Sequence, residues 1–452
     1  VLEVQDAVQV ALQTGLKVKV AGNGHSANDV ICSDGLVISS KNLNKIIKVE
    51  KFNREEVVVV QPGATLGALA EWLHKKDLSL GLTLIGYRGV TVAGSTATGS
   101  HGSSPKHNSV LANLIRSIKL VNAEGEIVTY SKNDLLPIQW QALKTSLGLL
   151  GVIVELKIAV EPQFNLRVKT TYHREKLLFN KDAMMGQMKD CDFGQINWFP
   201  AAGKFVKACG MRTTDPADQG ATNSLLEPDI PNFIIKPFKT VLQYGACHNW
   251  VSCLIEKVRY LHFGIQPYFK KLNKRGQLVS SHNVVGPSHK MTSSTFTEKA
   301  QGFAQMDWEI AVPMSQLPSA MLAVKKHIET HNICLPLIGL FIRFTRADDS
   351  TIMSHSSSGD GFKKGELIAF IEMPVFLPYG FNEERNKEYD SPYEEFTRIL
   401  IQKFKGRAHW AKNRNWVFKM QSKIGKYPTK TKKFQSIITK MDPDGVFSNW
   451  FG

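Results

Sequence analysis

The chain has 452 residues, of which 43% are hydrophobic and 21% are charged. At about 150 residues per domain this length predicts two or three domains, and the ordinary apolar fraction excludes a mainly disordered chain. No apolar run approaches the roughly 20 residues that a membrane-spanning helix needs, so we expect a soluble globular protein. The first residue is Val rather than Met, and we expect the chain to be processed or trimmed there.

Basic side chains outnumber acidic ones by 56 to 40, a net charge of +16, and the excess is uneven. Residues 1–163 hold 16 basic and 14 acidic side chains, whereas residues 403–440 hold 12 basic and no acidic ones. A surface of this kind suits an anionic small molecule, anionic lipid or nucleic acid. Because no nucleic-acid recognition motif accompanies the charge, we expect no specific nucleic-acid partner. A weak contact of 403–440 with a membrane surface or another polyanion stays open.

The six cysteines are scattered and form no C-x-x-C pair, so we predict no metal site. Cys247 and Cys253 are close enough in sequence to pair in an oxidising compartment. The sequence leaves the compartment and the oligomeric state open.

Residues 1–163 alternate between helical and strand-like patterns. Thr65 stands where a helix N-cap belongs, ahead of Leu66, Leu69 and Leu73 at helical spacing. The patterns predict helices at 2–12, 66–73 and 139–146, and strands at 16–20, 35–39, 56–61, 110–121, 126–130 and 151–160. This is the texture of an α/β or α+β domain.

From residue 164 to about 400 strand-like stretches alternate with a few longer helices. We predict strands at 164–172, 308–312, 339–345 and 367–376, and helices near 316–330 and 391–405. The pattern indicates an antiparallel sheet with covering helices, so the fold class that we expect for the whole chain is α+β.

Three glycine-rich segments lie in the first part of the chain: Val20 to Ser26, Gly89 to Ser104 and Ser146 to Ile153. Glycine allows positive φ and close backbone approach, so successive N–H groups can cradle a diphosphate. The first segment reads GxGxS and precedes no helical pattern, so it is not the GxGxxG dinucleotide motif. The second consists almost entirely of small or hydroxylated residues, which suits a large flat ligand. Each segment alone could be a tight turn; together they favour a nucleotide cofactor.

These segments and three later ones resemble the FAD-linked oxidases of the vanillyl-alcohol-oxidase type, which carry a PCMH-type FAD-binding domain, and among them the sugar-lactone oxidase branch. The front of the chain is similar through AGNGHS, GVTVAGSTATGSHGSS and SLGLLGVI. The back is similar through RFTRADD (343–349), GRAHWAK (406–412) and MDPDGVFSN (441–449). The six blocks stand in the family's order and cover most of the chain.

The resemblance implies an FAD-binding domain over 1–163, a substrate-binding or cap domain over 164–400 and a C-terminal segment, 401–452, that returns to the flavin. It implies an FAD-dependent oxidase that moves a hydride from the CH–OH of a sugar lactone, polyol or other alcohol to flavin N5. The expected electron acceptor is O2, with H2O2 as product. An oxidase differs from a dehydrogenase in the access of oxygen to the flavin, which small residues such as Ala97 and Ser100 could control. Two alternatives stay open: an oxidase of a less polar alcohol or amine, and a flavin scaffold without net redox turnover.

The resemblance also implies roles for single residues. His25 would carry FAD covalently through its C8 methyl, which suits a nucleophilic neutral imidazole. Arg343, Lys412 and His409 would be catalytic, the two cations stabilising negative charge that develops on the flavin. His101 would support or touch the flavin. The cofactor contacts expected in this way are Ala21, Gly22, Asn23, Gly24, His25, Ser26, Gly89, Val92, Gly94, Ser95, Thr98, Gly99, His101, Gly102, Gly148, Gly151, Val152, Ile153 and Lys412.

One position departs from the family's pattern. Sugar-lactone oxidases usually carry Glu two residues before the catalytic Arg, where it accepts hydrogen bonds from substrate hydroxyls, whereas this chain has Phe341. A phenyl ring cannot accept those bonds, so the chemistry is inherited more safely than the substrate. We expect Phe341, Glu309 and Trp410 to line the substrate pocket, and for Glu309 a structural salt bridge is an equally open alternative.

Alternatives remain for the basic residues. Arg343 could instead form a salt bridge with Asp348 or Asp349. Arg407 and Arg414 are expected at the surface or on a phosphate.

Overall fold

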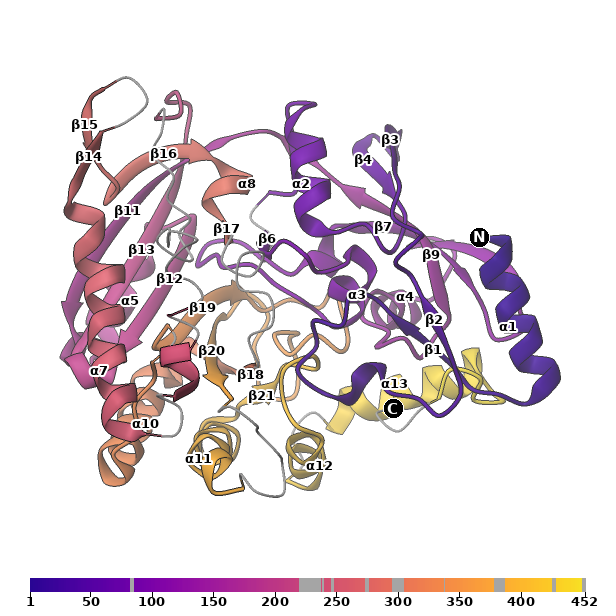
Figure 1. Cartoon of the computed structure of the whole chain (residues 1–452). Coiled ribbons are helices and arrows are strands. Elements are labelled where there is room, and N and C mark those ends of the chain that lie inside the picture. The colour runs from indigo at the N-terminus through magenta and orange to yellow at the C-terminus, as the bar shows by residue number, and fades with distance from the viewer. Residues whose placement is uncertain are drawn as a thin grey trace.

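The structure is a computed structural model that describes residues 1–81, 85–218, 237, 240–244, 248–272, 276–294, 305–336, 338–377, 387–424 and 428–448. Two antiparallel sheets organise these residues, a five-stranded one in the N-terminal part and an eight-stranded one that follows it (Figure 1). No helix among these residues is long and apolar enough to cross a membrane.

The N-terminal sheet has the strand order β3-β4-β9-β7-β8 and carries short helices around it. Its strands are β3 (Ile46–Phe52), β4 (Glu55–Val60), β7 (Ile115–Val121), β8 (Ile127–Ser131) and β9 (Val152–Ala159). The other elements are α1 (Leu2–Thr14), the parallel pair β1 (Val18–Ala21) and β2 (Leu36–Ser39), α2 (Leu66–His74), β5 (Leu78–Ser79), β6 (Ile85–Tyr87), α3 (Val92–Ala97), α4 (Pro137–Lys144) and β10 (Glu161–Pro162).

Local sequence explains how α2 and α3 begin. Thr65 caps α2, since its Oγ1 accepts a hydrogen bond from the amide of Ala68 at 3.2 Å, as the spacing predicts. Thr91 caps α3 in the same way through the amide of Gly94. The apolar face of α2 packs into the core beneath the sheet, where Leu66, Leu69 and Leu73 are fully buried.

The second sheet has the strand order β16-β11-β13-β12-β19-β20-β18-β21. Its strands are β11 (Asn165–Arg174), β12 (Phe193–Phe199), β13 (Lys204–Thr213), β16 (Asn283–Pro287), β18 (Gln305–Pro313), β19 (Leu340–Arg346), β20 (Leu367–Phe376) and β21 (Arg407–Ala408). Around it lie α5 (Lys181–Met188), α7 (Asn249–Tyr260), β14 (Lys270–Leu272), β15 (Leu278–Ser280), α8 (Ser288–Met291), β17 (Ser293–Ser294), α10 (Leu317–His331), α11 (Lys387–Phe404), α12 (Asn415–Lys423) and α13 (Pro428–Met441).

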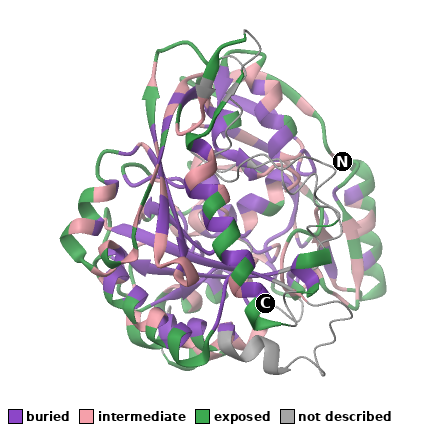
Figure 2. Cartoon of the chain, turned by 60° about the vertical axis from the view of Figure 1, so that its left-hand side comes forward, coloured by how far each residue is buried: buried purple, intermediate pink, exposed green. Residues whose placement is uncertain are grey.

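The two faces of this sheet differ in character. Alternate residues such as Trp308, Ile310 and Ile342 point into one large apolar core that α10 and α11 cover. Figure 2 shows the result, with strands largely buried and the outer faces of the helices exposed. The intervening residues, among them Glu309 and Arg343, point to the opposite face, toward the N-terminal part. Period-two alternation therefore directs charge onto one face.

The C-terminal helix α13 returns to the N-terminal part. Its Phe434 and Ile437 are buried in the same core as Leu66 and Leu69 of α2. The chain thus passes from the first sheet through the second and comes back, which brings residues far apart in sequence together (Figure 1).

The α+β fold class is confirmed, and most predicted elements occur within a few residues of their predicted bounds. The predicted strand 110–121 begins only at Ile115, because residues 111–114 form a 3₁₀ turn. The second glycine-rich segment contains the short helix α3. The strand β12 was not predicted, although Gln195 to Trp198 alternate between polar and apolar residues; all seven of its residues are buried.

The cysteine pairing differs from the one considered from sequence. Cys253 of α7 pairs with Cys334, which follows α10, and Cys191 pairs with Cys209; Cys247 lies outside the described residues. Cys253 and Cys334 meet because their segments pack side by side, with Cα atoms 4.9 Å apart. Sequence proximity had suggested the wrong partner.

Removing the long-range disulfide with Cys253→Ser and Cys334→Ser together is expected to lower the free energy of unfolding by about 4 kcal/mol, because the bond closes a loop of 81 residues. Urea denaturation measures the loss, and Cys32→Ser, which removes an exposed free thiol, is the control that should leave stability unchanged. Alkylation without reductant should spare both paired cysteines; labelling of Cys253 in the folded protein would contradict the pairing.

Candidate active site

A single cleft brings the three glycine-rich segments together with the charged face of the second sheet. Its walls carry Gly22, Asn23, Gly24, His25 and Ser26 from the first segment, Val90, Thr91, Ala93, Gly94, Ser95, Ala97, Thr98, Ser100 and His101 from the second, and Ser146, Leu147, Gly148, Gly151 and Ile153 from the third. The remaining wall includes Asp307, Arg343, His409, Ala411 and Lys412. Segments separated by hundreds of residues therefore share one ligand site.

Hydrogen bonds hold the segment of His25 against its neighbours. Asn23 Nδ2 donates to the carbonyl oxygen of Gly89 at 2.8 Å. The Ala27 amide donates to the carbonyl oxygen of Ala411 at 2.8 Å. A Cβ at Gly89 would stand 3.0 Å from His25 Nε2, so glycine is the residue that lets the two segments approach. The histidine loop is thus fixed both to the second glycine-rich segment and to the C-terminal segment.

The part of the cleft lined by Lys19 and the glycine-rich segments offers polar groups that suit the diphosphate and ribose of a dinucleotide. The hydroxyl of Ser95 is buried at the wall and has no hydrogen-bond partner among the described residues. Lys19 of β1 also lines this cleft, is buried, and donates to the carbonyl oxygen of Leu147 at 3.1 Å. Burial lowers the pKa of Lys19 to about 8, and an anionic ligand would offset that cost. Leu147 and Gly148 adopt positive φ there, so the backbone itself bends around the cleft.

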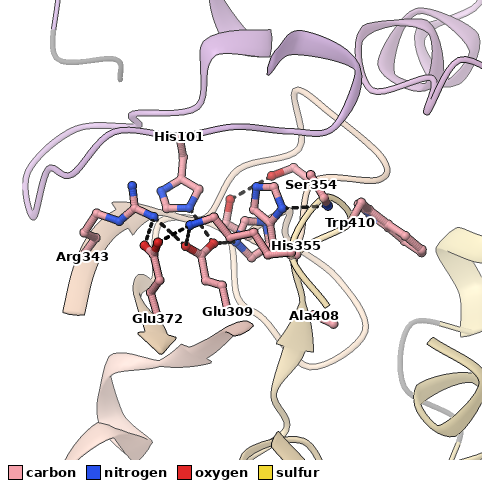
Figure 3. Close-up of polar contacts among 12 residues, drawn as sticks. His101, Glu309, Arg343, Ser354, His355, Glu372, Ala408 and Trp410 are labelled. Carbon is pink, nitrogen blue, oxygen red and sulfur yellow. Dashed lines mark hydrogen bonds and ion pairs between the residues drawn. The ribbon is translucent and has the colours of Figure 1, made fainter. Parts of the chain in front are cut away.

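At the floor of the cleft two carboxylates and two cations alternate. Glu309 Oε2 accepts from Arg343 Nη2 at 2.6 Å and from Lys412 Nζ at 3.2 Å. Glu372 contacts the same two cations, with Lys412 Nζ 2.5 Å from Oε1 and Arg343 hydrogen-bonded to Oε2. Glu309, Glu372 and Arg343 converge from three strands (Figure 3), and Lys412 reaches both carboxylates from the segment after β21. Two positive and two negative charges balance, which makes their burial tolerable.

Strand register creates this arrangement. Glu309 of β18 stands directly opposite Glu372 of β20, and Glu372 stands opposite Phe341 of β19. Two like charges opposite one another repel, so Arg343 and Lys412 are needed between them. The segment after β21 is tied to β18 because the amide of His409 donates to the carbonyl oxygen of Glu309 at 3.1 Å. That bond positions Lys412 three residues later.

Three histidines complete the floor. His101 Nε2 and His355 Nε2 lie 2.8 and 3.0 Å from Glu309 Oε1, and His409 Nδ1 accepts from the amide of Ala411. Burial lowers the pKa of all three imidazoles and so favours their neutral forms. Burial alone would raise the pKa of Glu309, but Lys412, His101 and Arg343 hold it well below its usual range.

Glu309 and the three histidines also bring their ligand atoms within 4.8 Å of one another, close enough for a metal ion. The oxygens of Glu309 already accept four hydrogen bonds, two of them from cations, which would repel a further positive charge. The contacts present are those of a hydrogen-bonded network.

Most residues predicted as cofactor contacts line the cleft. Those that do not are Ala21, Gly89, Val92, Gly99, Gly102 and Val152. Val92 is fully buried in the core of the N-terminal part, and Gly89 acts through its contact with His25. The predicted catalytic trio, Arg343, Lys412 and His409, lies together at the floor.

The three residues expected in the substrate pocket lie away from this cleft, and Glu309 forms the salt bridges that its alternative role predicts. None of them is on the wall of the cleft. Glu309 is fully buried behind Arg343 and Lys412, and Phe341 is buried with its ring centre 5.1 Å from the Arg343 guanidinium carbon. Trp410 donates from its indole to the carbonyl oxygen of Met353 at 2.5 Å and stacks on Phe418. The phenyl ring at 341 therefore does not face this cleft.

The basic residues also need correction. Arg343 pairs with Glu309 and Glu372 rather than with Asp348 or Asp349. Arg407 is buried and donates to the carbonyl oxygen of Ser357 at 2.5 Å, not exposed as expected. Arg414 donates to the carbonyl oxygen of Ala27 and thus supports the histidine loop.

Sequence reasoning missed Lys19, Asp307, His355 and Glu372, although all are buried at or behind the cleft. A signal existed for two of them. Lys19 stands inside the strand-like run LKVKV, and Glu372 interrupts the apolar run of β20. A charge within an apolar strand is costly unless a partner faces it, so each position points to a buried counter-charge or ligand.

Comparison with known families identifies the chain. The family described as FAD binding domain matches residues 1–131, and the family described as D-arabinono-1,4-lactone oxidase matches residues 156–451. The chain belongs to the D-arabinono-1,4-lactone oxidase family. The chain is also similar to relatives that match almost all of it.

Two such relatives differ in the activity that their names give, one an oxidase and the other a dehydrogenase. The chain is 28% identical over 451 residues to L-gulonolactone oxidase of Mus musculus, covering 99% of this chain and 91% of that protein. It is 23% identical over 448 residues to L-gulono-1,4-lactone dehydrogenase of Mycobacterium tuberculosis, covering 99% and 92%. The fold is shared with cholesterol oxidase from Brevibacterium sterolicum, with a TM-score of 0.72, 16% identity and coverage of 99% and 91%.

The chain is therefore an FAD-dependent oxidoreductase of the aldonolactone oxidase and dehydrogenase family, and it acts on lactone CH–OH donors. The FAD-binding family match supports FAD as the cofactor, and the cleft, with the unpartnered hydroxyl of Ser95 and the buried Lys19 among the described residues of its wall, offers polar groups that fit it.

Proposed function

We propose that this aldonolactone oxidase relative oxidises a CH–OH carbon of a sugar lactone at the floor of the cleft, with O2 as the electron acceptor. When bound, FAD would supply the two-electron acceptor for the substrate hydride, with O2 as the final oxidant and H2O2 as its product. The substrates named for relatives, L-gulonolactone and D-arabinono-1,4-lactone, are the first candidates.

One observation supports the proposal above the others: the cations Arg343 and Lys412 stand in front of the carboxylates Glu309 and Glu372. Arg343 and Lys412 line the cleft, whereas Glu309 and Glu372 are at most 2% exposed behind them. The carboxylates fix the cations and balance their charge. A ligand that gains negative charge at the floor therefore meets two preorganised cations first.

Oxygen consumption and H2O2 formation test this function. The purified holoprotein should consume O2 with aldonolactones and form peroxide in equal amount. Turnover that requires an artificial electron acceptor and consumes no O2 would contradict the oxidase proposal. It would favour a dehydrogenase, which is how the mycobacterial relative is named.

We also propose that His25 carries the FAD covalently. The imidazole lines the cleft, and burial lowers its pKa, so the nucleophilic neutral form dominates at neutral pH. A bond from a ring nitrogen to the C8 methyl carbon replaces one methyl C–H and one imidazole N–H. The two electrons and two protons released reduce one O2 to H2O2.

His25→Ala is expected to abolish the linkage completely while FAD still binds through the other segments of the cleft. After acid precipitation the wild-type pellet should stay yellow, whereas the variant should release its flavin to the supernatant. His107→Ala, which alters an exposed histidine, is the matched control. Yellow colour in the wild-type supernatant would refute a covalent bond.

A further inference from the structure

Asp307 is a buried carboxyl group for which the described residues provide no hydrogen bond at one oxygen. It lies on β18 two residues before Glu309, so both side chains share the face of the sheet toward the cleft. Asp307 lines the cleft, is 9% exposed, and its Oδ1 has no hydrogen-bond partner among the described residues.

The neighbouring carboxylates are already saturated. Glu309 accepts four hydrogen bonds, and Glu372 holds both cations. Of these three acidic side chains, Asp307 is the one that reaches the wall of the cleft. An acceptor that is buried and unpaired favours a ligand that brings a donor, such as a hydroxyl group.

The charges around Asp307 set its ionisation. Glu309 faces it from its own strand, Glu372 from β20, Arg343 from β19, and Lys412 from the segment after β21. Burial is the main cause that raises the pKa of Asp307 to about 6; Lys412 and Arg343 oppose the rise, and Glu372 and Glu309 add to it. At neutral pH the group is mostly a carboxylate, and it becomes a poorer acceptor as the pH falls through that value.

We propose that Asp307 accepts the proton of the substrate hydroxyl that is oxidised. The O–H bond breaks and its proton moves to a carboxylate oxygen of Asp307. The C–H bond of the same carbon breaks, its hydride leaves with both electrons to the FAD, and a C=O bond forms. This inference rests on the proposed function, since it assigns the proton acceptor of that reaction.

The test compares Asp307→Asn with the wild type in two measurements on the holoprotein. In turnover with L-gulono-1,4-lactone and D-arabinono-1,4-lactone, wild-type kcat/KM should rise with pH through about 6, and the variant should lose this limb with a 10²- to 10⁴-fold lower kcat/KM. Without substrate, the visible flavin spectrum should titrate near the same pH in the wild type and not in the variant. Asp349→Asn, an exposed carboxylate paired with Lys364, is the matched control.

The outcomes separate the two claims. Turnover of Asp307→Asn within threefold of the wild type, with the acidic limb retained, overturns the inference and leaves the proposed function intact. A flavin-loaded wild type that oxidises no lactone overturns the proposed function, and the spectral titration then still decides whether Asp307 ionises beside the flavin. A structural role predicts a less stable variant, whereas relief of a buried charge predicts unchanged or higher stability at neutral pH. If the amide does not fold, Asp307→Ser receives the same measurements.

Discussion

Lys412→Met is expected to lower kcat/KM with an aldonolactone by about 10²- to 10³-fold, the usual loss when one preorganised charge-stabilising group is removed. Lys412 lines the cleft with a side chain 14% exposed, and Glu309 and Glu372 hold its ammonium in place. Although burial opposes it, those carboxylates raise the pKa of Lys412 above its ordinary value, so the charge persists throughout the working pH range.

Steady-state kinetics with the flavin content of each preparation measured in parallel give the value. Lys412→Arg keeps the charge and should recover part of the activity, whereas Lys364→Met removes an exposed lysine and should change nothing. Equal loss in the Met and Arg variants would mean that packing around position 412, rather than its charge, supports the reaction.

The second large effect concerns stability. Glu309→Gln is expected to lower the free energy of unfolding by about 3–5 kcal/mol at neutral pH, because it leaves buried cations without their partner. Four donors surround the native carboxylate. The NH2 group of the new glutamine is itself a donor, so it would face either the two histidines or the two cations without an acceptor. Glu50→Gln at the half-exposed pair with Lys48 and Lys157 is the control, with a loss of about 0–1 kcal/mol.

The difference in unfolding free energy between the wild type and Glu309→Gln should shrink as the pH falls. The pKa of Glu309 in the folded chain lies well below its unfolded value of about 4.3, so its stabilisation is present above that value and is lost as the pH falls toward the folded pKa. Denaturant titrations at neutral and acidic pH should therefore show the wild type and Glu309→Gln converging in acid. A difference in unfolding free energy that grows in acid would contradict the lowered pKa of Glu309.

Local signals in the sequence predicted the elements and the cleft wall well. Thr65 at an N-cap, the period-two runs and the glycine-rich segments act over a few residues, so they can be read without the fold. The charged floor could be read only in part. Arg343, His409 and Lys412 were found through family motifs, but their partners Glu309 and Glu372 depend on the register between β18 and β20, which no single segment encodes.

The same limit explains the errors. Phe341 was assigned to the pocket from its position beside Arg343, yet the cross-strand Glu372 supplies the carboxylate that contacts this arginine, and the phenyl ring is buried. Cys253 was matched with a near neighbour in sequence, although packing beside α10 gives it Cys334. Both depend on contacts between distant segments.

Anaerobic mixing of the holoprotein with L-gulono-1,4-lactone or D-arabinono-1,4-lactone tests the central claim most directly. The account predicts that the visible band of oxidised flavin bleaches in the wild type and bleaches at least 100-fold more slowly in Lys412→Met, an expectation of about the size set by loss of one preorganised charge. A fully flavinated wild type whose band persists with these lactones and with other sugar lactones and polyols would contradict the assignment of lactone oxidation to this cleft.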